Sequence, residues 1–106
     1  MVIHILTLEG CPNCNAAKEL AEQTVRELHV LADIEGIQVN NEIEAERYHF
    51  LGSPTIQVNG EDIEVDRRHE KASYACRVYR TVHGVAGVPP KQLLVDAIRE
   101  AQLHSS

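Results

Sequence analysis

The residues best suited to chemistry are in the run Cys11-Pro12-Asn13-Cys14, where two thiols lie three positions apart. The run follows a mostly apolar stretch, residues 2–8, which predicts a strand buried on both faces. A helical pattern follows it, and proline is favoured at the first position of a helix, so we expect Cys11 to be the N-cap residue. The outward N–H groups and partial positive charge of a helix N-terminus then favour a thiolate at Cys11.

Two kinds of chemistry suit this pair of thiols. In thiol–disulfide exchange, Cys11 is the nucleophile and Cys14, one turn into the helix, is the resolving thiol. The alternative is capture of a soft metal, mercury or zinc, because thiolates are the ligands that such ions prefer. Cys76 is then a candidate third ligand, and His69 or His83 a candidate fourth. A third hypothesis is a binding module in which the cysteines take no part.

The strand, the C-P-N-C motif and the helix resemble the start of a thioredoxin-superfamily domain, and the C-P-x-C form is closer to glutaredoxins than to thioredoxin itself. A second motif, Gly52-Ser53-Pro54-Thr55, lies at the separation that an intervening βαβα segment requires. In the family, a cis-proline at the start of the third strand faces the C-x-x-C, and Ser53 and Pro54 match that position. The resemblance implies that a backbone edge at Ser53-Pro54 faces the partner. The substrate-binding residues that it implies are Pro12, Ser53, Pro54 and Thr55.

The sequence departs from the family pattern in two places. It has no Trp beside Cys11, and it lacks the G-G-x-D turn with which glutaredoxins bind glutathione, so glutathione is not an expected partner. The runs 50–55 and 76–79 also bear a loose likeness to small thioredoxin-like proteins grouped with alkylmercury lyases. That likeness is the source of the mercury variant of the metal hypothesis.

The remaining patterns predict the elements that position the two motifs. Apolar spacing and turn signals predict strands at 2–8, 55–58 and 61–65, and helices at 12–28, 41–50 and 89–103. The apolar residues near 33–39 have no clean period, and the resemblance implies that the second strand lies there. Asn41 and Glu44 have the spacing of a capping box, and Asn59-Gly60 is typical of a type I′ hairpin turn. We therefore predict an α/β, thioredoxin-like fold of order β-α-β-α-β-β-α, with a central mixed four-stranded sheet flanked by helices.

Residues 66–88, called the inserted segment below, have no counterpart in the minimal family fold. A mixed charge run at 66–71 and the glycines and prolines near its end predict mainly loop. Cys76 lies within it, and because free cysteine is among the most buried residue types, we expect Cys76 to be a buried apolar side chain.

Length and composition limit the class of protein. A chain of 106 residues, 43% of them hydrophobic, is sufficient for a single domain, residues 1–106. A net charge of −6 argues against nucleic acid as a partner, which requires cationic contacts to phosphate. No signal peptide is visible, and no apolar run reaches the roughly 20 residues of a membrane span. We expect a cytoplasmic protein without a cofactor, acting on a protein or small-molecule disulfide.

Overall fold

A computed structural model describes residues 1–104 of the chain. It contains six strands, three α-helices and one 3-10 turn within those residues. In chain order these are β1 (Val2–Thr7), α1 (Cys14–Glu27), β2 (Asp33–Gln38), α2 (Glu42–Tyr48), β3 (Thr55–Val58), β4 (Glu61–Asp62), the 3-10 turn η1 (Val65–Arg67), β5 (Tyr79–Thr81), β6 (Gly84–Ala86) and α3 (Lys91–His104). None of the helices in this part of the chain has the length and apolar character needed to cross a membrane.

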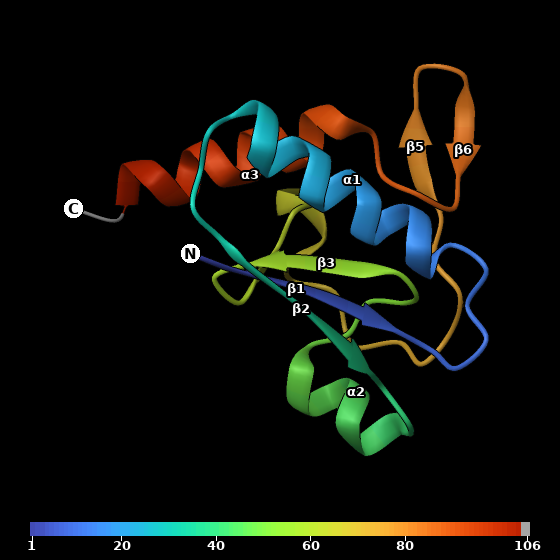
Figure 1. Cartoon of the computed structure of the whole chain (residues 1–106). Coiled ribbons are helices and arrows are strands. Elements are labelled where there is room, and N and C mark those ends of the chain that lie inside the picture. The colour runs from blue at the N-terminus through green and yellow to red at the C-terminus, as the bar shows by residue number, and fades with distance from the viewer. Residues whose placement is uncertain (105–106) are drawn as a thin grey trace.

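The first four strands form one mixed sheet in the order β2-β1-β3-β4. β1 is parallel to β2 and antiparallel to β3, and β4 returns antiparallel to β3. Helices α1 and α3 lie over one face of the sheet, and α2 lies on the opposite side (Figure 1). The predicted α/β class and mixed four-stranded sheet are confirmed.

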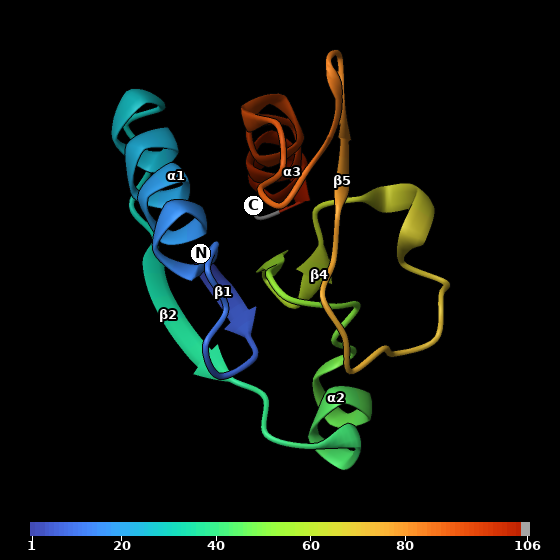
Figure 2. The ribbon, with the colours of Figure 1, turned by 90° about the vertical axis from the view of Figure 1, so that its right-hand side faces the viewer.

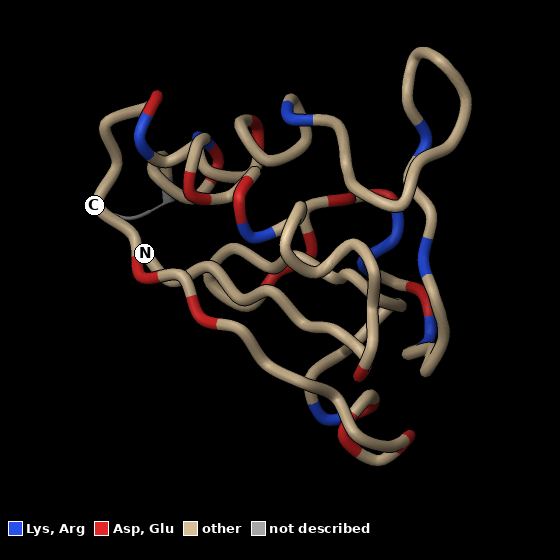
Figure 3. Tube along the Cα trace, turned by 45° about the vertical axis from the view of Figure 1, so that its right-hand side comes forward, with Lys and Arg blue, Asp and Glu red and all other residues tan. Residues whose placement is uncertain are grey.

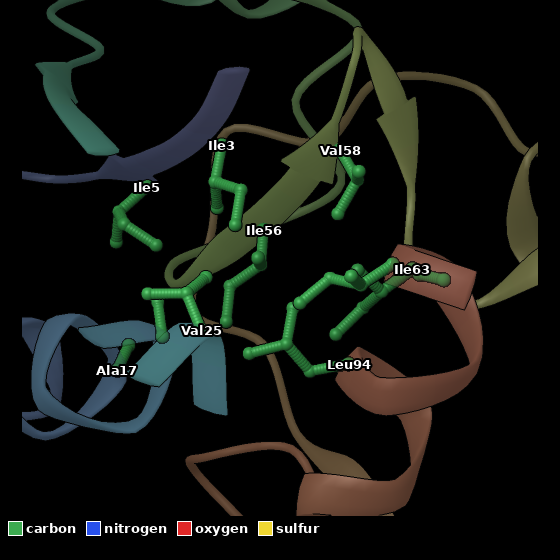
Figure 4. Packing of buried hydrophobic residues seen from close by; sticks show 11 residues of the cluster. Ile3, Ile5, Ala17, Val25, Ile56, Val58, Ile63 and Leu94 are labelled. Atoms are coloured by element: carbon green, nitrogen blue, oxygen red, sulfur yellow. The ribbon is translucent and has the colours of Figure 1, made fainter. Parts of the chain in front are cut away.

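The central strand β1 is packed on both sides, as its apolar composition predicts. Ile3 and Ile5 belong to the larger cluster, which includes residues of α1, β3 and α3 (Figure 4). Leu6 belongs to a second cluster with Ala45 of α2 and with Phe50. Because side chains alternate along a strand, β1 packs against both clusters at once. Its end therefore fixes where the loop that carries Cys11 begins.

Helix α1 begins at Cys14, so the prediction of Cys11 as the N-cap is wrong. The N-cap is Asn13, whose side chain makes no capping hydrogen bond. Before it, the Cys14 N–H donates to the Cys11 carbonyl at 3.4 Å, which closes a turn over Pro12 and Asn13. Proline's fixed φ suits the second position of such a turn as well as the first of a helix, and here the turn is formed.

Helix α2 begins as its sequence predicts. The Asn41 side chain accepts a hydrogen bond from the Glu44 N–H at 2.8 Å, which is the first half of a capping box. The second half is shifted by one residue, because Glu44 accepts from the N–H of Asn40 at 2.9 Å. The Asn59-Gly60 turn also has the positive φ angles, +51° and +85°, that a type I′ turn requires.

The inserted segment is more ordered than a loop. The return strand ends at Asp62, three residues early, because the Asp62 carboxylate accepts from the Glu64 N–H at 2.8 Å and turns the chain. After η1 the chain runs past the sheet and forms the β5–β6 hairpin, which projects beside the helices (Figures 1 and 2). The prediction of mainly loop for this segment is therefore wrong at residues 79–86.

Candidate functional site

The two thiols of the C-P-N-C motif lie at the junction of β1 and α1, as predicted. Cys11 is in the connecting turn and Cys14 is in the first turn of the helix, and both are half-buried free thiols. The Cys14 Sγ lies 3.8 Å from the Oγ1 of Thr7, the last residue of β1. Thr7 is only 7% exposed, so its hydroxyl is a polar neighbour of Cys14 on the inner side of the turn.

The second motif is tied to the first by a hydrogen bond. The Ser53 Oγ accepts from the N–H of Leu8 at 3.0 Å, and the carbonyl of Leu8 in turn accepts from the Cys11 N–H at 3.2 Å. The Ser53–Pro54 peptide bond is cis. Ser53, Pro54 and Thr55 are all buried, whereas Pro12 is exposed. The structure therefore brings the two motifs together but leaves little side-chain surface at residues 53–55.

The chain itself covers the backbone of Ser53. The Ser53 N–H donates to the Ala75 carbonyl at 2.8 Å, and the Ser53 carbonyl accepts from the Arg77 N–H at 3.0 Å. This pairing forms a parallel bridge in which Cys76 lies opposite Ser53. The contact is close at Gly52 as well, where an added Cβ would lie 2.8 Å from the Cβ of Arg77.

A buried ion pair holds this part of the inserted segment. The Arg77 guanidinium bonds both carboxylate oxygens of Asp62, at 2.7 and 2.9 Å, and the side chains of both residues are fully buried. Arg77 also donates to Glu64 at 2.8 Å and to the Thr55 hydroxyl at 3.3 Å. Burial alone lowers the pKa of Arg77, but its hydrogen bonds, chiefly to Asp62, raise that pKa above its usual value.

Tyr79 adds a second anchor next to Arg77. Its hydroxyl donates to the carbonyl of Pro54 at 2.5 Å, and its ring lies under the guanidinium with 4.4 Å between ring centroid and Arg77 Cζ. Burial raises the pKa of Tyr79, so the phenol stays protonated and remains a donor at neutral pH.

Cys76 does not behave as predicted. Its side chain is exposed, because the neighbouring Arg77 and Tyr79 take the inward positions. Within residues 1–104, no group of three or more His, Cys, Asp and Glu side chains is placed to share a metal ion. The structure therefore does not bring Cys76 to Cys11 and Cys14 as a third ligand, nor does it add His69 or His83.

Two arginines at the start of the inserted segment are paired with carboxylates, most of which lie on neighbouring elements. Acidic and basic positions are interspersed along the chain (Figure 3), and Arg67 and Arg68 make ion pairs with Glu64, Glu70, Glu61 and Glu100. The Arg67 hydrogen bond lowers the pKa of Glu70, an exposed carboxyl. These pairs stabilise the turn that follows β4 and present no concentrated charge.

Sequence patterns did not indicate Thr7 as a neighbour of Cys14, nor Arg77 and Tyr79 as the anchors of the segment that covers Ser53. Thr7 was visible only as a polar break in an apolar strand, four residues before Cys11. The alternation of Tyr74, Cys76 and Val78 with Arg77 and Tyr79 indicates an extended segment with one buried face, but side-chain polarity alone assigns burial to the wrong face, that of Cys76.

Comparison with known proteins supports the same fold. A family model described as a thioredoxin domain matches residues 1–64, more than half of the chain, and ends just before the inserted segment. A thioredoxin from Methanocaldococcus jannaschii is 30% identical over 99 residues, which cover 92% of this chain and 92% of the relative. No solved structure matches the chain significantly. The family suggests a thiol–disulfide redox function and implies protein disulfides as substrates in general. The chain belongs to the thioredoxin family.

Proposed function

We propose that the protein is a thiol–disulfide oxidoreductase in which Cys11 and Cys14 form a redox-active pair. The observation that carries the proposal is the placement of two half-buried free thiols at the β1–α1 junction, with the Thr7 hydroxyl beside the inner one. Cys11 lies ahead of the helix, in the connecting turn, which suits the first attack on a substrate disulfide. Cys14 lies within the helix and is held against β1, which suits the second step of the exchange.

The proposed reaction transfers two electrons to the substrate. The Cys11 thiolate attacks one sulfur of the substrate disulfide, the substrate S–S bond breaks, and the displaced sulfur leaves as a thiolate that takes up a proton. Cys14 then loses its proton to solvent and attacks the Cys11 sulfur. The mixed disulfide breaks, the second substrate thiol leaves, and a Cys11–Cys14 disulfide forms. An external dithiol such as dithiothreitol restores the two thiols by the same exchange.

Contact of Pro12, Ser53, Pro54 and Thr55 with the substrate stays a prediction. Pro12 is exposed beside the thiols, which supports such a contact. The other three are buried, so any contact through them would be through backbone atoms.

Catalysed disulfide reduction tests the proposed function. With dithiothreitol in excess, we expect the wild-type protein to accelerate reduction of a chromogenic aromatic disulfide above the rate with dithiothreitol alone. The Cys76→Ser variant should keep the wild-type rate, because Cys76 is exposed on the inserted segment and is not one of the reacting thiols. An absence of acceleration by folded wild-type protein would contradict the proposal.

Replacing Thr7 should affect the second step alone. The Cys14 thiol donates to the Thr7 hydroxyl, and once the thiol has lost its proton the same hydroxyl is placed to donate to the thiolate. We expect Thr7→Val to slow closure of the Cys11–Cys14 disulfide by about threefold to tenfold, because this hydrogen bond to the thiolate is lost. Stopped-flow measurement of release from a preformed mixed disulfide reports this step. Thr7→Ser keeps the hydroxyl and serves as the control, with a rate near that of wild type. Equal rates in Thr7→Val and wild type would show that the hydroxyl does not assist Cys14.

A further inference from the structure

We propose that the inserted segment closes the backbone edge beside the dithiol, so that the site does not prefer disulfides carried in extended peptides over compact, low-molecular-weight disulfides. The inference rests on the proposed function. It concerns how the substrate is recognised, and it starts from the hydrogen bonds of Ser53.

An extended peptide binds a sheet edge by pairing its backbone with free N–H and C=O groups. Ser53 lies next to the dithiol, because its hydroxyl accepts a hydrogen bond from the Leu8 N–H and the Leu8 carbonyl accepts one from the Cys11 N–H. Both of its backbone groups are already bonded, the N–H to Ala75 and the C=O to Arg77. Each residue has one backbone donor and one carbonyl in the plane of the ladder, so the position of a partner strand at Ser53 is filled.

Residues 75–77, called the covering strand below, are anchored too firmly to be exchanged readily for a peptide. Lifting residues 75–77 would separate the buried Arg77 guanidinium from Asp62 and Glu64. Leaving either charge of such a pair buried without its partner is strongly unfavourable. The Tyr79 hydroxyl, bonded to the Pro54 carbonyl, holds the same strand from its other end.

The inserted segment also reaches the C-P-N-C turn. The backbone of Gly87, just after the hairpin, lies directly against the side-chain amide of Asn13, so that an added Cβ would collide with it. Figure 1 shows this part of the chain, in orange, passing the start of α1, and Figure 2 shows the segment running alongside β4. The segment therefore covers Ser53 and abuts the turn, while Cys11 and Cys14 stay partly exposed. A small disulfide needs only that exposed surface.

The test compares one disulfide in two settings. The short substrate is the mixed disulfide of 2-mercaptoethanol with a capped single cysteine, and the long one carries the same cysteine in the middle of an extended, uncharged peptide. We expect the kcat/KM values of the wild-type protein for the short and the long substrate to agree within about twofold, because the peptide adds no backbone hydrogen bond. A gain of about tenfold or more for the peptide, the effect of one or two added backbone hydrogen bonds, would overturn the inference. Failure to reduce either substrate would overturn the proposed function, and the inference with it.

A variant that frees the strand provides the converse test. In Asp62→Asn/Arg77→Met no buried charge is left without its partner, and the strand loses its ion pair. We expect faster hydrogen exchange at the Ser53 amide, an unchanged rate on the short disulfide, and a new preference for the peptide. Fast exchange at Ser53 without that preference would show that the strand does not determine substrate choice. The wild-type comparison decides the question by itself if this variant does not fold.

Discussion

The Cys14→Ser variant is expected to stop the reaction at the mixed disulfide. Cys11 can still attack the substrate, but the residue that should displace the second thiol is a hydroxyl, which does not attack a disulfide. Turnover should therefore fall to the rate at which dithiothreitol itself opens the mixed disulfide, and without a reductant the substrate should stay covalently attached in a one-to-one ratio. Mass spectrometry after mixing with an excess of disulfide measures the adduct, and peptide mapping should locate it at Cys11.

The Cys11→Ser variant is the matched comparison, since it retains Cys14 but places it on the inner side of the turn, beside Thr7. We expect no turnover and much slower adduct formation. Cys76 is exposed and reacts with disulfides as any surface thiol does, so both variants should be made with Cys76→Ser. Rapid adduct formation at Cys14 in the Cys11→Ser protein would reverse the roles assigned to the two thiols.

The parts of the fold that the sequence predicts well are those fixed by local chemistry. The apolar run of β1, the Asn41 cap and the Asn59-Gly60 turn each depend on neighbours a few residues away. The start of α1 is also local, yet it was predicted wrongly. Pro12 satisfies either a helix start or the turn that precedes one, and residue type alone does not separate the two.

The inserted segment was missed because its stability comes from contacts distant in sequence. Arg77 and Asp62 lie 15 positions apart, and Tyr79 bonds a carbonyl 25 positions away. General preferences also point the wrong way here, since cysteine is usually buried and arginine usually exposed. In this segment Cys76 is exposed and Arg77 is 4% exposed, because only arginine supplies the donors that Asp62, Glu64 and Thr55 require. The candidate dithiol could thus be predicted from the sequence, whereas the strand that covers its neighbouring edge could not.

Loss of the buried Arg77 side chain is expected to produce the largest change in stability. The Arg77→Met variant leaves the fully buried Asp62 carboxylate without its partner, a loss of about 3–5 kcal/mol in the free energy of unfolding. Chemical denaturation followed by circular dichroism measures that loss. The matched control is Arg80→Met, which removes an exposed arginine three residues further on and should change stability by no more than about 0.5 kcal/mol.

The double variant Asp62→Asn/Arg77→Met separates the ion pair from the packing of Arg77. If the loss in Arg77→Met comes from a stranded carboxylate, removing the charge of Asp62 should restore much of the stability, since a neutral amide costs far less to bury than a carboxylate. If the double variant is as unstable as Arg77→Met, then the hydrogen bonds of the guanidinium to Glu64 and Thr55, and its contact with the Tyr79 ring, carry the stability instead. Equal stability of Arg77→Met and Arg80→Met would contradict the anchoring role of Arg77, because a strand held so weakly would yield Ser53 to any peptide that competed for it.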